Sequence, residues 1–204
     1  MATETSIRID LSGVEAVERE MNRLQGRELD RAIIMALNKT GAKAQTQADR
    51  AIRDRFAISR DQVRRSFVFV RARQGSMRNA EAVLRIFGSP TKRGRSMNMV
   101  RFLERQVSLA EGRRRAKQGT RNALHFKILR RGGLKTIGGA FLGNKGRTVF
   151  RRTGMTRLPI EPVQVIGVSQ MFNTRSVRER VITTLEREYL TEMRRAIDQV
   201  LRTR

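Results

Sequence analysis

The alternation of apolar and polar residues divides the chain into strands and amphipathic helices. Residues 7–11 alternate as in a short half-buried strand, and Ser12 with Glu15 then forms the pattern of a capping box. This pattern predicts a helix to about Gln25, and Gly26 separates it from the next element. A long amphipathic helix is predicted beyond Gly26, because apolar positions recur there every three or four residues. They are Leu29, Ile33, Leu37, Thr40, Ala44, Ala48, Ile52 and Phe56.

Several short strands are predicted after this helix. Ser59 and Gln62 mark the start of a short connecting helix. Runs rich in β-branched and aromatic residues follow, and these residue types favour strands. The predicted strands cover residues 67–70, 82–87, 124–129, 148–150 and 163–168.

A second long amphipathic helix is predicted at the end of the chain. Ser176 and Glu179 form another capping-box pattern, and one apolar stripe follows at helical spacing. Its members are Val177, Val181, Leu185, Tyr189, Met193, Ile197 and Val200. These elements predict an α+β fold in which an antiparallel sheet is packed by the long N-terminal-half helix and the C-terminal helix. Residues 1–204 are expected to form one domain, because a chain of this length fits a single core.

Positive charge is the strongest compositional signal. The chain has 44 Lys and Arg residues against 19 Asp and Glu residues, a formal net charge of +25. Only seven of the basic residues are Lys, and the planar guanidinium of Arg suits phosphate and carboxylate partners. A polyanion is therefore expected near the protein.

Much of the charge asymmetry lies in a loop-rich segment at residues 92–157. This segment has 19 basic residues but only Glu104 and Glu111 as acids. A charge run is usually a solvated loop, but the surplus of 19 basic residues over two acids favours nucleic-acid proximity, and the basic clusters are candidates for DNA contact. The candidate DNA-facing residues are Arg113, Arg114, Arg115, Lys117, Arg130, Arg131 and Lys135.

Other kinds of chemistry have little support in the sequence. The chain has no Cys, and its single His, His125, lies in an apolar stretch where a packed core residue is more probable than a metal ligand. The glycines at 138–139 and 143–146 do not match a phosphate-loop fingerprint and predict turns. No signal peptide or membrane-spanning segment is recognised. We therefore expect a protein that is not an enzyme, with no metal and no cofactor; a metal-dependent nuclease is the enzymatic alternative.

A run in the C-terminal half resembles the signature of the phage minor tail protein Z family. It comprises residues 146–154, then Arg157-Leu158-Pro159-Ile160, then Ser169-Gln170-Met171-Phe172. Residues 36–40 and 139–141 match the same family in order and spacing. The motif residues assigned to a partner interface or to the family fold are Phe150, Arg151, Arg152, Gly154, Arg157, Leu158 and Pro159.

This resemblance implies a tail-completion protein in the virion of a long-tailed phage, made in the host cytoplasm. It would lie at the head-proximal end of the tail, beside the tail terminator and other neck proteins, and help to position the end of the double-stranded genomic DNA. A homo-oligomeric ring is implied, most simply a hexamer on a sixfold tail tube. Membrane contact is not expected. The alternative is a free, sequence-independent nucleic-acid-binding protein.

Overall fold

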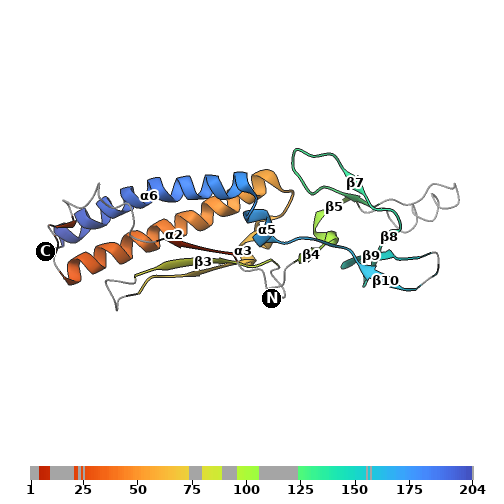
Figure 1. The fold of residues 1–204 in the computed structure, drawn as a ribbon, viewed down its shortest axis with the longest axis horizontal. Helices are drawn as coiled ribbons and strands as arrows, with labels where there is room; N and C mark the ends of the chain where they lie inside the picture. Colours follow the sequence, from red (N-terminus) through yellow and green to blue (C-terminus); the bar gives the residue numbers. More distant parts are fainter. Residues whose placement is uncertain are drawn as a thin grey trace.

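Two long helices, α2 (Arg27–Arg55) and α6 (Arg175–Arg202), lie side by side and form one end of an elongated molecule (Figure 1). The computed structural model describes residues 5–9, 21–22, 24, 26–73, 80–88, 96–105, 124–154, 156 and 158–203. The helices are antiparallel, because Lys43 bonds to Glu188 and Glu192 while Asp54, further along α2, bonds to Arg180. The two apolar stripes predicted from the sequence are buried, except for the partly buried Leu29.

The helix α2 is buried on two sides and forms the middle layer of this end. It lies between α6 and a three-stranded antiparallel sheet of order β1-β3-β2 (Figure 1). The strands are β1 (Thr5–Ile9), β2 (Phe67–Val70) and β3 (Ala82–Ile86). Alternate residues of β3, namely Ala82, Leu84 and Ile86, are buried, as expected when one sheet face packs on a helix. The short helix α3 (Arg60–Arg65) connects α2 to β2.

The other end of the molecule is built from small antiparallel sheets (Figure 1). One sheet pairs strands from the two halves of the chain, and two others have three strands in the orders β10-β9-β8 and β5-β6-β7. The short helix α5 (Val168–Phe172) is mostly buried and joins this end to α6. The strands are β4 (Ser96–Asn98), β5 (Leu103–Arg105), β6 (His125–Phe126), β7 (Lys135–Thr136), β8 (Ala140–Gly143), β9 (Thr148–Arg152), β10 (Ile160–Pro162) and β11 (Gln164–Ile166).

Two asparagine side chains connect neighbouring segments, because each amide group both donates to and accepts from the backbone of one residue. The amide of Asn38 in α2 donates to the carbonyl oxygen of Ala72 at 3.1 Å and accepts from its N–H at 2.8 Å. Asn98 bonds in the same way to both backbone groups of Val149, at 3.1 and 2.9 Å. Each pair satisfies groups that would otherwise lack partners in a part-buried site.

The predicted α+β class is confirmed, and most element positions agree with the sequence pattern. The long helix, the Ser59 cap, the strand at residues 67–70 and the strand that begins at Ala82 are all present. The strands form several small sheets, with α2 between α6 and the first of them. The capping box at Ser12 and Glu15 and most of its predicted helix lie outside the described residues.

Three local predictions were wrong or only partly right. The helix α6 begins at Arg175, so Ser176 is not its N-cap residue. The hydroxyl of Ser176 instead accepts a hydrogen bond from Arg55, and Glu179 pairs with Arg175. The strand predicted at residues 163–168 ends at Ile166, because the chain turns into the buried helix α5. In the segment 124–129 only His125–Phe126 forms a strand. His125 is half-buried there and not in the core, because Phe126 takes the buried face.

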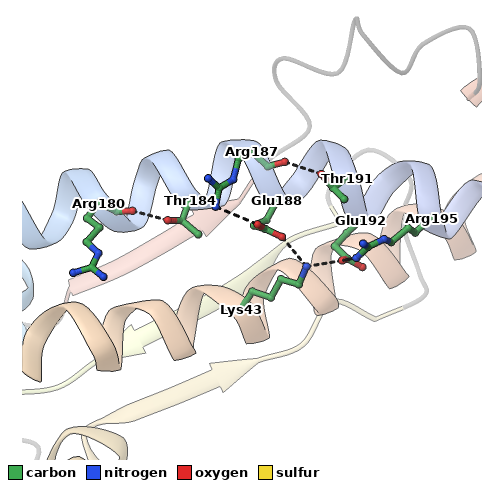
Figure 2. Close-up of polar contacts among 8 residues, drawn as sticks. All are labelled: Lys43, Arg180, Thr184, Arg187, Glu188, Thr191, Glu192 and Arg195. Atoms are coloured by element: carbon green, nitrogen blue, oxygen red, sulfur yellow. Dashed lines mark hydrogen bonds and ion pairs between the residues drawn. The ribbon is translucent and has the colours of Figure 1, made fainter. Parts of the chain in front are cut away.

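A cluster of charged residues joins α2 to α6 near their middle. Lys43 Nζ lies 2.7 Å from Glu188 Oε2 and 2.6 Å from Glu192 Oε1, as Figure 2 shows. Arg195 Nη1 donates to the same oxygen of Glu192 at 2.7 Å. The side chain of Glu192 is only 4% exposed, so these two cations supply the partners that a buried carboxylate requires.

The pKa values of the cluster are shifted toward the charged forms. Hydrogen bonds to Glu188 and then to Glu192 raise the pKa of Lys43, and the bond from Lys43 lowers the pKa of Glu188. Burial has the largest single effect on Glu192 and opposes its ionisation. The hydrogen bonds and charges of Lys43 and Arg195 together outweigh it, so the pKa of Glu192 is also below its ordinary value.

The substitution Gly41→Ala tests the close approach of β2 to α2. Ala normally stabilises a helix by about 1 kcal/mol relative to Gly. A Cβ at position 41, however, would collide with the ring of Phe69. Because overpacking costs about 1–3 kcal/mol, we expect a net loss of up to about 2 kcal/mol in the free energy of unfolding measured by urea denaturation. The double variant Gly41→Ala/Phe69→Ala should lose less free energy of unfolding than the two single variants lose together. A Gly41→Ala protein more stable than the wild type would contradict the packing.

The substitution Lys43→Met tests the charged cluster and its pH dependence. At neutral pH we expect a loss of about 1 kcal/mol in the free energy of unfolding, since the charged bond to buried Glu192 disappears and Lys43 itself is partly exposed. The lowered pKa values of Glu188 and Glu192 mean that their contribution is present above their unfolded pKa, about 4.3, and is lost as the pH falls through the folded values. The pKa of Lys43 is raised in the folded protein, so the stability that Lys43 contributes is lost only as the pH rises through its folded pKa.

The difference between wild type and Lys43→Met should therefore be largest between about pH 5 and 10 and should shrink in acid. Melting temperatures measured across this range and below it, in acid, provide the comparison. Lys39→Met is a suitable control, because Lys39 is exposed on the same helix and has no ion pair among the described residues. An equal effect of both substitutions at every pH would show that the cluster adds nothing specific.

Candidate nucleic-acid and partner interface

The motif segment that begins at residue 146 forms a hairpin and an added edge strand. The strands β8 and β9 pair with Phe141 opposite Phe150, and β10 pairs with β9 on the other side. The turn at residues 144–147 needs positive φ angles at three successive positions, which Asn144, Lys145 and Gly146 supply. The sequence prediction of a turn at this point is confirmed.

Aromatic and basic motif residues contact each other on this sheet. The rings of Phe141 and Phe150 are stacked with centroids 6.1 Å apart. The guanidinium carbon of Arg152 lies 5.4 Å from the centroid of Phe141, within the range of a cation–π interaction. Arg151 lies opposite Glu161 in the register of β9 and β10. Phe150 is therefore half-buried under side chains of its own sheet, while Arg151 and Arg152 are exposed.

The connection between β9 and β10 exposes apolar residues of the motif. Leu158 is 65% exposed, and the Leu158–Pro159 peptide bond is cis. The N–H and hydroxyl of Thr153 both donate to the carbonyl oxygen of Pro159, so the two sides of the connection are tied together. Gly154 and Pro159 are exposed as well, and Arg157 lies outside the described residues. Further along the same motif, Phe172 is buried at 1% exposure and belongs to the core.

The basic candidates separate into groups. Arg113, Arg114, Arg115 and Lys117 lie outside the described residues. Lys135 is exposed in the short strand β7. Arg130 and Arg131 follow an antiparallel bridge between Leu129 and Phe56, and the N–H of Arg130 donates to the carbonyl oxygen of Arg55 at 2.9 Å. The structure thus brings Arg130 and Arg131, but not Lys135, to the C-terminal end of α2.

A hollow of about 600 Å³ lies where the end of α2 meets the start of α6. Four arginines and one acid are among its lining residues: Arg55, Arg130, Arg131, Arg180 and Asp54. Arg55 Nη1 donates to Ser176 Oγ at 2.7 Å, and Arg180 Nη1 lies 2.7 Å from Asp54 Oδ2. This geometry was not predicted from the sequence, because Arg55 and Arg180 belong to two helices that lie far apart in the chain.

A second hollow, of about 460 Å³, lies further along the same helix pair. Arg50, Arg187 and Lys43 are among its lining residues. On α2, positions 43, 47, 50 and 54 are spaced three or four apart, and so are positions 180, 184 and 187 on α6, so both hollows open on one face of the pair. Lys43 is paired with Glu188 and Glu192 (Figure 2). Among the described residues, positive charge without a carboxylate partner is therefore greater near Arg55, Arg130 and Arg131 than near Lys43.

The described side chains include groups that can bind anions or proteins, but they form no metal site. Over the described residues, no three His, Cys, Asp or Glu side chains gather closely enough to hold a metal ion. None of the helices in the described ranges combines the length and the apolar character needed to cross a membrane. The exposed guanidinium groups are hydrogen-bond donors for phosphate or carboxylate, and exposed Leu158 is available for contact with another protein.

Comparison with known sequences identifies the family. The family described as Prophage minor tail protein Z (GPZ) matches residues 11–204, which is nearly the whole chain. No curated protein and no solved structure gives a significant match to the chain. The match covers both long helices, the small sheets and the hairpin that carries the motif, as the resemblance implied. The chain therefore belongs to the minor tail protein Z family and is a structural protein of the phage tail, located in the virion.

Proposed function

We propose that this minor tail protein completes the head-proximal end of the tail, beside the tail terminator, and helps to position the end of the double-stranded genome. The observation that supports this role best is the arginine-lined hollow between α2 and α6 in a chain of net charge +25. A protein at the end of a tail tube lies next to DNA, and exposed guanidinium groups neutralise phosphates without reading base sequence.

The end of the molecule that is built from small sheets is suited to protein contact. Leu158 is 65% exposed, and Arg151 and Arg152 lie on the neighbouring strand β9. Exposed apolar side chains beside arginines are common in protein interfaces. We therefore propose that this end binds other tail or neck proteins, or a second copy of the chain.

A ring of identical subunits, most simply a hexamer on a sixfold tail, would place copies of the basic hollow around a central channel. The net charge of +25 opposes self-association of the free protein, since like charges repel. Assembly of the ring would therefore depend on a tail partner or on DNA to reduce the repulsion. A free nucleic-acid-binding protein is the alternative function, and it would be found with nucleic acid and not in tail particles.

The location is tested by a density map of the neck of intact virions. We expect several copies of this chain, related by rotation about the tail axis, at the head-proximal end of the tail. The elongated shape formed by α2 and α6 makes the chain recognisable in such a map (Figure 1). One copy per tail would exclude the ring, and absence of the chain from purified tails would favour the free nucleic-acid-binding protein.

The basic segment outside the described residues is tested by charge reversal. Replacing Arg113, Arg114 and Arg115 by Glu should leave tail assembly intact, because the substitutions lie outside the long helices and the motif of β9 and β10. Retention or delivery of the genome should fail, because three phosphate contacts become repulsive.

The control for this charge reversal replaces Arg31, Arg194 and Arg202 by Glu, an equal change in net charge at exposed positions of α2 and α6. Virions of the first variant that hold their DNA and infect normally would contradict DNA contact by this segment. Loss of tail assembly would instead make the segment a protein interface.

A further inference from the structure

The hollow between the ends of α2 and α6 has more positive charge than its own acids neutralise. Arg55, Arg130, Arg131 and Arg180 line it, and Asp54 is its one lining acid among the described residues. Asp54 is used by Arg180, at 2.7 Å. The other three arginines have no carboxylate partner in the described part of the chain, so most of their N–H donors remain available.

Backbone hydrogen bonds and one salt bridge join the three segments that carry these arginines. The N–H of Ala57 donates to the carbonyl oxygen of Ile128 at 2.9 Å, and the N–H of Arg130 donates to that of Arg55 at the same distance. These bonds fasten the turn that carries Arg130 and Arg131 to the end of α2. Arg180 comes from the start of α6, the third segment, and the salt bridge to Asp54 joins it to α2. The backbone positions that carry the donors are therefore fixed before any ligand arrives, which lowers part of the entropic cost of binding.

The electrostatic field of α6 acts in the same direction. The first turn of this 28-residue helix contains no acidic residue, and its N-cap residue, Thr174, makes no side-chain capping bond. The positive end of the helix thus adds to the four guanidinium groups. Ser176 in this first turn has a hydroxyl that accepts from Arg55, and its own proton is free to point toward a bound oxygen.

We infer that this hollow binds a phosphodiester group of the DNA backbone, with Arg55, Arg130 and Arg131 as the principal donors and Arg180 as an additional one. The inference rests on the proposed function for its ligand and assigns that contact to particular residues. A volume of about 600 Å³ accommodates a phosphate together with its flanking sugars. The donors are guanidinium and hydroxyl groups on a hollow outside any base-reading motif, so binding is independent of sequence.

The test measures DNA binding by the purified full-length protein. Fluorescence anisotropy of a labelled duplex of about 20 base pairs is recorded between about 50 and 200 mM salt. The double variant Arg130→Gln/Arg131→Gln is compared with Arg194→Gln/Arg202→Gln, which removes the same charge from exposed positions far along α6. Since each neutralised phosphate contributes about 0.9 to the salt slope and the hollow is assigned one phosphodiester group, the first variant should lose up to about one unit of slope. The control should keep the wild-type slope, apart from a small uniform weakening.

Arg55→Gln and Arg180→Gln extend the test to the two helices. Arg55→Gln should weaken DNA binding and reduce the slope by no more than about one unit, because Arg55 contacts the same phosphate as Arg130 and Arg131. Circular dichroism melting should confirm that each variant is folded. An oligoglutamate peptide serves as a competing anion, to separate phosphate from carboxylate binding. Peptide binding that depends on Arg130 and Arg131, with DNA binding unchanged in the same variant, would overturn the inference and assign the hollow to an acidic segment of a protein partner.

The remaining outcomes separate this inference from the proposed function. Equal losses in the two double variants would show that DNA binds diffusely to the positive surface, and the hollow would not be a site. Unchanged DNA binding in all hollow variants would move the contact elsewhere, for example to residues 113–117. Neither result bears on the place of the protein in the tail, which the neck map tests independently.

Discussion

The packing of α2 on both of its sides is the constraint on which the rest of the structure depends. A helix buried between another helix and a sheet must have apolar or small residues on most of its circumference. Alanines at positions 32, 36, 44, 48 and 51 and Gly41 are all buried in α2 and allow its neighbours to approach closely. The sheet and α6 do not need to contact each other extensively, because each is positioned by α2. The end of α2 then fixes the place at which residues 128–130 and the start of α6 meet.

The two buried acids of this very basic chain hold elements together among the described residues. Glu192 and Asp49 are both buried, and each is neutralised by two cations, Lys43 and Arg195 for the first and Arg53 and Arg60 for the second. These pairs connect α2 to α6 and to the start of α3. Acids that are paired in this way do not neutralise the arginines around the hollow where the end of α2 meets the start of α6. The local surplus of positive charge there follows from how the acids are distributed, as well as from the overall composition.

The family motif contains residues with different physical roles. Val149 and Phe172 are buried, Phe150 stacks on Phe141, and Leu158 is exposed. Asn38, in the other matching segment at residues 36–40, bonds to both backbone groups of Ala72. Part of the motif therefore maintains the fold and part of it remains on the surface for other molecules. Residue type alone does not separate the two, because Leu37 of the segment at residues 36–40 is buried whereas Leu158 is exposed.

The sequence by itself determined the positions of the long helices, the early strands and the class of fold. Periodicity in an amphipathic helix reflects which side is buried, and it is readable when a helix has many turns, as between Leu29 and Phe56 or between Val177 and Val200. Short strands of two or three residues gave weaker signals, and the start of α6 was misjudged because Ser176 bonds to Arg55, 121 positions earlier in the chain. The family motif and the net charge indicated a tail protein close to a polyanion.

Only the tertiary structure brought Arg55, Arg130 and Arg180 around one hollow, because these residues are distant in sequence. Their proximity depends on the packing of α2 against α6 and on the backbone bonds between residues 55–57 and 128–130.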